Sequence, residues 1–331
     1  MVFCTIITSD YIHYALALRE SLLQFQESVQ LYILVSDVEA GLKEKVQTDY
    51  PQTYVIYPDE VCSGGLGKAI YEKYAHTYTD GFRWSMKPVF MKYILEEHHK
   101  NRIIYLDCDI QFFSDYAFLW NLFADYKCIL SPHNRSLSAQ NDSFNFKMNF
   151  TEGIYNGGFF GARKDALDVL DWWAEACLFE CRVDKENGMY VDQKYLDILP
   201  ARFEKVYSIK HLGCNVADWN ISECKRVKVK EVVKINGVYE IVFIHFSNGE
   251  LVNILNGNDK LLLPYFTIYA ERLQKYGNGY YLGSFIKDKY LNASNYSFDR
   301  GLNKVESGKL KSYFRKKTIN GLTRVINYLN K

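Results

Sequence analysis

Residues 101–113 have the sequence NRIIYLDCDIQFF, in which a short apolar run leads directly into two aspartates. The run at 102–106 has the pattern of a buried strand. That strand would deliver Asp107 and Asp109 into the loop at its carboxyl end. One intervening residue lets both carboxylates approach a single Mg²⁺ or Mn²⁺ ion, which keeps positions open for substrate phosphates. The alternative is a capped turn in which either aspartate accepts hydrogen bonds from backbone N–H groups.

The sequence before this stretch alternates between strands and helices. The runs at 2–8 and 31–35 have the pattern of buried parallel strands, and residues 54–57 indicate a third short one. Apolar residues recur at helical spacing over 14–25, and residues 39–48 also favour a helix. This alternation predicts an α/β fold with a mostly parallel sheet flanked by helices. Ligands of such sheets bind beyond the carboxyl ends of the strands, where the two aspartates would lie.

Later segments give further local predictions. A helix over 87–98 is indicated by Pro88, because proline suits the first turn of a helix. Residues 133–149 are polar and rich in Asn and Ser, which predicts a mobile loop, either an active-site lid or an ordinary surface excursion. We also expect a short helix over 191–199 and one strand over 239–246.

Length and composition indicate a folded protein. The chain has 331 residues, of which 48% are hydrophobic. We predict one main domain over 1–260 and a helical basic extension over 261–331. Residues 1–11 lack the basic segment and the apolar length of a signal peptide. No stretch approaches the roughly 18 apolar residues of a membrane-spanning helix, so we expect a cytoplasmic protein.

Charge is balanced over the whole chain but not along it. The formal net charge is +1, which argues against nucleic acid as a partner. Residues 300–331, however, contain nine Lys or Arg and one acidic residue, with apolar residues at helical spacing over 309–330. Such a helix suits an anionic membrane surface, and predicts a peripheral position on the inner face of the plasma membrane. The alternative is a helix packed on the main domain with a solvated basic face.

Cysteine and aromatic residues carry less information. The eight cysteines lack metal-binding spacing, and the Cys177/Cys181 pair has no further ligand nearby, so reduced thiols are expected. Aromatic residues make up 16% of the chain. They could line a carbohydrate site, because their flat apolar faces suit sugar rings, or they could simply fill the core.

Matching segments, taken together and in order, resemble a known family over residues 1–250. They are TSDYIHYALALRESL, SMKPVFMKYIL, IIYLDCDI, GIYNGGFFGARK, LDWWAE, YVDQKYLDILP, HLGCNVADWN and FIHFSNG. The chain resembles the GT-A glycosyltransferases, and is most similar to the bacterial nucleotide-diphospho-sugar transferases akin to family 8, the glycogenin and lipopolysaccharide galactosyltransferase group. The resemblance implies a GT-A, Rossmann-like fold with a mixed, mostly parallel sheet.

The resemblance implies a complete metal site. Asp107 and Asp109 would bind Mn²⁺ or Mg²⁺ bridging the phosphates of a nucleotide, and His245 would be the third protein ligand. From its residues alone, His245 is better explained as a satisfied buried histidine. Lys87 would neutralise the diphosphate, with a solvent-facing lysine as the alternative. The loop after His245 reads Ser-Asn-Gly where Ser-Gly is usual in the family, which leaves its phosphate-binding part uncertain.

The resemblance also places the nucleoside. Thr8 and Tyr11 follow the first strand, where the base and ribose would bind, and Tyr11 could stack on the base or pack in the core.

The donor sugar would lie beside glycines and a carboxylate. Asn156, Gly157 and Gly158 match the family's turn facing that sugar, where glycines let the backbone approach a ligand closely. Asp192 and Gln193 match the pair beside the anomeric carbon, although Asp192 could instead cap a helix. The segment that would frame the donor or acceptor pocket holds three further candidates: Asn215, Asp218 and Trp219.

These inferences predict a metal-dependent transferase that moves a hexose or similar sugar from a UDP-sugar to a hydroxyl of a cell-surface glycan or lipid-linked oligosaccharide. Inversion would require Asp192 as a base. Retention, which the family favours, would let the departing phosphate take the proton while Asp192 and Gln193 stabilise the reacting centre. A sugar-binding pseudo-transferase and a sugar-nucleotide nucleotidyltransferase are the alternatives. The second lacks its Gly-rich signature here, and Gln111 also argues against a HAD-type phosphatase.

Overall fold

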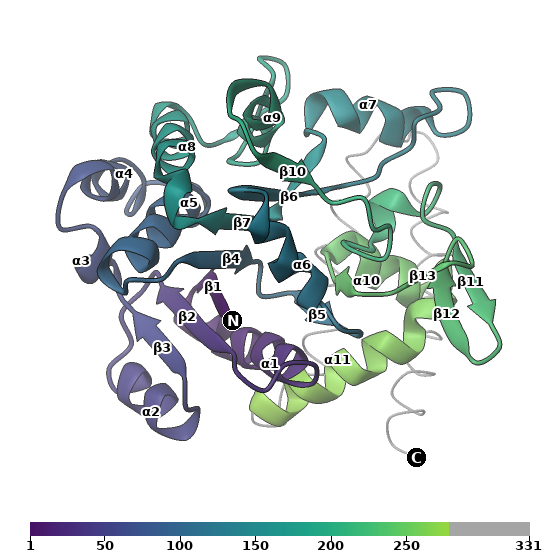
Figure 1. Ribbon diagram of the computed structural model, residues 1–331, viewed down its shortest axis with the longest axis horizontal. Helices are drawn as coiled ribbons and strands as arrows, with labels where there is room; N and C mark the ends of the chain where they lie inside the picture. Colours follow the sequence, from purple (N-terminus) through teal and green to yellow (C-terminus); the bar gives the residue numbers. More distant parts are fainter. Residues whose placement is uncertain (278–331) are drawn as a thin grey trace, which may run out of the picture.

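The computed structural model describes residues 1–277, and a seven-stranded sheet forms its centre (Figure 1). The strand order is β10-β6-β7-β4-β1-β2-β3. The bounds are β1 Val2–Ile7, β2 Gln30–Val35, β3 Thr53–Ile56, β4 Arg102–Leu106, β6 Cys128–Pro132, β7 Tyr155–Arg163 and β10 Val206–Ser208. Strand β7 runs antiparallel to both β4 and β6, while the other neighbouring pairs are parallel. The predicted mixed, mostly parallel sheet is confirmed.

Helices cover both faces of the sheet. Their bounds are α1 Ile12–Leu23, α2 Leu42–Asp49, α3 Pro58–Val61, α4 Gly65–Tyr74, α5 Thr79–Glu97, α6 Ala117–Asn121, α7 Ser143–Thr151, α8 Leu167–Phe179, α9 Leu199–Arg202, α10 Asn248–Leu255 and α11 Leu263–Tyr276. Helices α4, α5 and α8 pack on one face, and α1, α2 and α6 pack on the other. Alternation along β1 divides the core, since Cys4 and Ile6 join the first cluster while Phe3 and Ile7 join the second.

Shorter strands complete the architecture. They are β5 Ile110–Phe112, β8 Val183–Asp184, β9 Met189–Tyr190, β11 Arg226–Val229, β12 Val232–Ile235, β13 Tyr239–Glu240 and β14 Phe243–His245. The strand predicted over 239–246 is wrong in one respect, because it is two strands that pair with different partners. Strand β13 joins the three-stranded sheet with β12 and β11, whereas β14 pairs antiparallel with β5.

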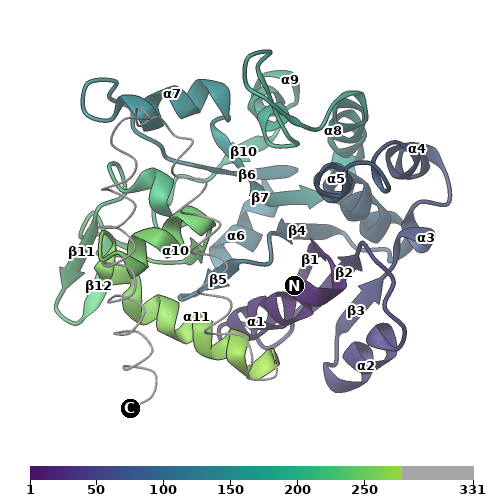
Figure 2. The same ribbon diagram turned by 180° about the vertical axis from the view of Figure 1, so that it is seen from behind.

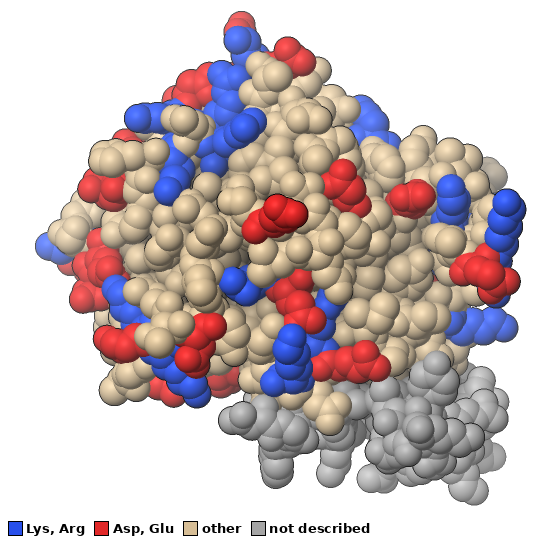
Figure 3. Space-filling model, turned by 60° about the horizontal axis from the view of Figure 1, so that its bottom comes forward, with Lys and Arg blue, Asp and Glu red and all other residues tan. Residues whose placement is uncertain are grey.

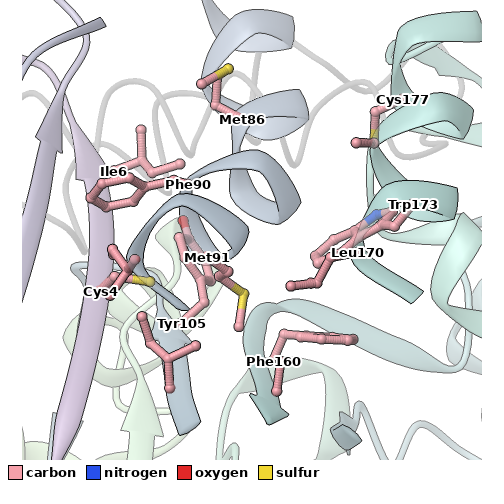
Figure 4. Packing of buried hydrophobic residues seen from close by; sticks show 14 of the residues in the cluster. Cys4, Ile6, Met86, Phe90, Met91, Tyr105, Phe160, Leu170, Trp173 and Cys177 are labelled. Carbon is pink, nitrogen blue, oxygen red and sulfur yellow. The ribbon is translucent and has the colours of Figure 1, made fainter. Parts of the chain in front are cut away.

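The cluster under α5 is rich in sulfur and aromatic rings (Figure 4). Met86, Phe90 and Met91 of α5 lie between the sheet and α8, which contributes Trp173. This packing explains why the predicted start of the helix was wrong: α5 begins at Thr79, and Pro88 lies in its interior. An interior proline costs about 3 kcal/mol, and burial of several large side chains exceeds that cost.

Two other local predictions need correction. The segment over 133–149, predicted as a loop, contains α7, whose first turn is capped by the Asp142 side chain accepting from Asn145 N at 3.0 Å. The helix predicted over 191–199 begins later, as a 3₁₀ turn over Lys194–Ile198 followed by α9. Val191 has a φ of 46°, which is left-handed and excludes a helical start there.

Helix α11 lies alongside α1 (Figure 2). Its Arg272 donates to Gln24 Oε1 at 2.6 Å and to Gln111 Oε1 at 3.0 Å, while Lys275 pairs with Glu20 at 2.6 Å. The first residues of the predicted extension over 261–331 therefore pack on the main domain. The basic segment 300–331 lies outside the described residues.

The described surface carries mixed charge. Figure 3 shows one face on which acidic and basic side chains are interspersed, in keeping with the small net charge of the chain. Over residues 1–277, the structure contains no helix with both the length and the apolar character needed to cross a membrane.

Candidate active site

The candidate site lies beyond the carboxyl end of β4, as predicted for an α/β sheet. The chain leaves β4 through Asp107 and Asp109 and enters β5, which pairs with β14 so that Ile110 faces His245. Phe246 N donates to the Asp109 carbonyl at 3.0 Å, and His245 Nε2 lies 3.1 Å from Asp109 Oδ1. A short strand pair therefore brings together residues that are far apart in the sequence.

Asp107, Asp109 and His245 each offer one ligand atom, and these three atoms lie within 4.8 Å of one another. Two carboxylate oxygens and one imidazole nitrogen suit Mn²⁺ or Mg²⁺. The Nδ1 atom of His245 is buried and has no hydrogen-bond partner among the described residues. Burial lowers the pKa of His245, but the Asp109 and Asp107 carboxylates outweigh it and raise the pKa above its usual value. A histidine held against two carboxylates in this way fits a cation site.

The carboxylate of Asp107 is held from one side by Tyr105 and Lys87. The Tyr105 hydroxyl donates to Asp107 Oδ1 at 2.7 Å, and Lys87 Nζ lies 3.6 Å from the same oxygen. The backbone N–H of Asp107 donates to the Gly158 carbonyl at 2.8 Å. The Asp107 carboxylate thus accepts from a tyrosine hydroxyl, rather than from the backbone N–H groups of a capped turn.

Lys87 is buried, with 4% of its side chain exposed, which excludes the solvent-facing alternative. Its ammonium group donates to the Gly157 carbonyl at 2.9 Å and lies 3.1 Å from Asp192 Oδ2. Burial lowers the pKa of Lys87, but the carboxylates of Asp107 and Asp192 on either side outweigh it and raise that pKa. For Asp192 burial is the larger effect and raises its pKa to about 6, although Lys87 opposes the shift.

Asp192 and Gln193 lie beside the glycines of β7. Gln193 Oε1 accepts from Gly157 N at 3.0 Å, and Gln193 Nε2 donates to the Glu152 carbonyl at 2.8 Å. The 3₁₀ turn that follows has Gln193 at its N-cap without a side-chain cap bond. The helix-capping alternative for Asp192 is therefore wrong, because this carboxylate contacts Lys87 instead.

The glycines allow this close approach. A Cβ built on Gly158 would lie 2.7 Å from His245 Cε1 and 2.8 Å from Asp107 Oδ2. A Cβ on Gly157 would lie 3.0 Å from Asp192 Oδ2. Only glycine leaves room for the carboxylates and the histidine on this side of β7.

Two adjoining cavities open over these residues. The larger, of about 540 Å³, is lined among others by Lys87, Asp107, Asn156, Gly157, Gly158, Asp192, Gln193, Asp218, Trp219 and His245. The smaller, of about 180 Å³, is lined by Ile6, Tyr11, Tyr14, Arg83, Trp84, Lys87, Tyr105, Asp107, Cys108 and Asp109. Three residues border both: Trp84, Lys87 and Asp107. The cavities together extend along the carboxyl edge of the sheet.

Most of the predicted site residues meet at these cavities, but two do not. Thr8 lines neither cavity and donates to Asp10 through its hydroxyl. Asn215 is buried and donates to the Pro132 carbonyl at 3.1 Å. The ring of Tyr11 stacks on that of Tyr14 with centroids 4.8 Å apart, at the edge of the smaller cavity.

Several lining residues were missed from the sequence. Trp84 and Tyr105 are examples, as are Arg135 and Glu152, which form a buried ion pair at 2.5 Å. For Tyr105 a signal existed, because side chains two apart on a strand point the same way as Asp107. No local signal marks Arg135, since its place depends on how the segment before α7 folds back.

Comparison with solved structures identifies the fold. The galactosyltransferase LgtC, solved in complex with donor and acceptor sugar analogues, superposes with a TM-score of 0.51 at 14% identity, covering 87% of this chain and 100% of LgtC. This likeness shows the shared GT-A fold, as the sequence predicted. The chain therefore belongs to the class of proteins with a GT-A fold.

Comparison of the sequence identifies a family within this fold class. Residues 3–167 match the sequence model of glycosyl transferase family 8, so the chain carries a domain of this family. Two Bacillus subtilis proteins are also similar: uncharacterized YfnF (25% identical over 257 residues, 76% of this chain and 82% of YfnF) and uncharacterized YfnD (28% over 256 residues, 76% and 78%). Asp192, Gln193 and His245 lie beyond the matched segment and are placed by the structure alone.

Proposed function

We propose that the protein transfers a hexose from a UDP-sugar to a hydroxyl of a cell-surface glycan or lipid-linked oligosaccharide, with Mn²⁺ or Mg²⁺ as cofactor. The observation that carries this proposal is the arrangement of Asp107, Asp109 and His245 beside Lys87 and Asp192, where the two adjoining cavities meet. Such a site brings a cation, a buried ammonium group and a buried carboxylate to one substrate.

Asp107, Asp109 and His245 would hold the cation, which when bound neutralises charge on the departing diphosphate. Lys87 adds a second positive charge close to the same phosphates, and its burial strengthens that interaction because water screens it poorly. The smaller cavity, with Tyr11 on its wall, suits a nucleobase. Thr8, predicted to lie where the base and ribose bind, lines neither cavity and has no part in this proposal.

The sugar would bind against the glycines of β7. Gly157 and Gly158 expose backbone to the cavity, and Asn156 Oδ1 accepts from Gly158 N at 2.6 Å within β7, where the resemblance had implied a turn. Asp192 and Gln193 face this position from the other side. Asp218 and Trp219 line the same cavity and could frame the donor or the acceptor.

Retention of configuration is the proposed outcome. The contact of 3.1 Å between Asp192 and Lys87 engages the carboxylate that inversion would need as a free base. Asp192 and Gln193 would orient the donor and stabilise positive charge at the anomeric carbon. The departing phosphate would then take the proton of the acceptor hydroxyl on the same face of the sugar.

The proposed transferase activity is tested with a panel of UDP-, GDP-, CDP- and dTDP-sugars, each with Mn²⁺ or with EDTA. We expect slow release of the nucleotide from a UDP-sugar, which requires the metal and is lost in Asp109→Ala. The matched control is Asp168→Ala, which removes an exposed carboxylate on α8 and should keep the activity. Binding without release in any metal would favour the sugar-binding pseudo-transferase. Failure to bind any nucleotide sugar would contradict the proposal.

A further inference from the structure

Tyr105 supports the candidate metal site from inside the core. It precedes Asp107 by two residues, and its hydroxyl donates to Asp107 Oδ1 at 2.7 Å. The tyrosine is 2% exposed and belongs to the cluster under α5, with Cys4, Phe90 and Phe160 (Figure 4). Its ring is therefore held by packing on the sheet, and its hydroxyl has a fixed position beneath the carboxylate.

The backbone does not by itself fix the carboxylate of Asp107. The hydrogen bond from Asp107 N to the Gly158 carbonyl holds the main chain in register with β7. The side chain, however, lies past the end of β4 and is 32% exposed, so its rotation is not blocked by packing alone. A directional partner is needed to hold one rotamer, and the Tyr105 hydroxyl provides it.

The positive charge of Lys87 also acts on the Asp107 carboxylate. Its ammonium group lies 3.6 Å from Asp107 Oδ1 and 5.1 Å from the centroid of the Tyr105 ring. A closer approach of Lys87 to Asp107 would compete with a cation for this carboxylate. The Tyr105 hydroxyl occupies the oxygen nearest Lys87 with a neutral donor, which keeps the acid oriented without adding positive charge.

We propose that Tyr105 is a positioning residue, which orients Asp107 for cation binding through its hydroxyl. The inference rests on the proposed function, because it assumes that Asp107, Asp109 and His245 bind a metal ion. Hydrogen-bonding partners behind metal ligands typically change metal affinity by about 10- to 100-fold. Tyr105 would contribute to affinity for the cation without touching it.

The test measures Mn²⁺ binding to the full chain by calorimetry and by the paramagnetic resonance signal of free Mn²⁺. Tyr105→Phe keeps the packed ring and removes only the hydroxyl, and we expect the Mn²⁺ dissociation constant to rise about tenfold. The matched control is Tyr116→Phe. Tyr116 is also fully buried, but its hydroxyl donates to the Leu22 carbonyl at 3.0 Å, away from the site, so its constant should stay within about twofold of the parent.

Three results would overturn the inference. An unchanged dissociation constant in Tyr105→Phe, with saturable Mn²⁺ binding that Asp109→Ala abolishes, would leave the metal site intact and remove Tyr105 from it. An equal loss in Tyr116→Phe would mean that any lost buried hydroxyl weakens binding. Absence of saturable binding in the parent chain would overturn both the inference and the metal dependence. If Tyr105→Phe lowers the melting temperature, Mn²⁺ binding is compared instead through the increase in melting temperature that Mn²⁺ causes in each variant.

Discussion

At the scale of single residues, the burial of two histidines makes the stability of the folded protein depend on pH. His13 on α1 is 4% exposed, and burial lowers its pKa to about 4, although Asp10 opposes the shift. His133 is 2% exposed, and burial together with Arg135 lowers its pKa well below the usual value. Both side chains are neutral in the folded state, whereas the unfolded chain protonates them near pH 6.5.

The unfolded state therefore binds more protons below pH 6.5, and stability falls as the pH decreases from about 6.5 toward 4. Each such group contributes at most about 1.4 kcal/mol per pH unit over this window. We expect His13→Gln to flatten the dependence of the unfolding free energy on pH, measured by urea denaturation between pH 7 and pH 4.5. The exposed His76→Gln should leave the slope as it was. Identical slopes in His13→Gln and the parent would contradict this assignment.

At the scale of elements, a glycine in β7 allows the side chains of the candidate metal site to pack directly against that strand. Gly158 lies directly against the side chains of Asp107 and His245, and a methyl group there would also lie 2.6 Å from Asn156 Oδ1. We expect Gly158→Ala to weaken Mn²⁺ binding by about tenfold or more, because the ligands must move apart. It should also cost about 1–3 kcal/mol of stability through overpacking.

The matched control for this substitution is Gly64→Ala, since a Cβ at Gly64 would meet no other atom within 4 Å. Calorimetry with Mn²⁺ and thermal melting compare the two variants. If Gly158→Ala bound Mn²⁺ as tightly as Gly64→Ala, the close packing of β7 would have no part in shaping the site.

The elements also show which parts of the site could be predicted. Strand β4 and its two aspartates were predicted because the signal is local: an apolar run followed at once by carboxylates. The start of α5 was predicted wrongly because Pro88 suggests a first turn, while tertiary packing carries the helix through it. His245 was assigned only by resemblance, since its contact with Asp109 depends on pairing between β5 and β14. The burial of Lys87 has no local signature, whereas Tyr105 lies two residues before Asp107 and its side chain points the same way.

At the scale of the whole molecule, the question is how the enzyme meets its acceptor. A lipid-linked acceptor would require the protein to work at the inner face of the plasma membrane, and the basic segment 300–331 is the proposed attachment. We expect removal of residues 302–331 to reduce sedimentation with anionic phosphatidylglycerol vesicles, while release of the nucleotide from the donor continues. Vesicles of neutral phosphatidylcholine are the control. Equal sedimentation with and without the segment would contradict membrane attachment by this route.

The pairing of β5 with β14 also sets the order in which the site can form during synthesis. The central sheet is complete once residue 208 has emerged from the ribosome, because β10 is its last strand. The third member of the cation cluster arrives only with β14, at residue 245. A nascent chain that stops between these points would contain every strand of the sheet and both aspartates, yet it would lack the histidine. Under the proposed function, the capacity to bind the cation therefore arises only after residue 245, and chains that stop between residues 208 and 245 would lack it.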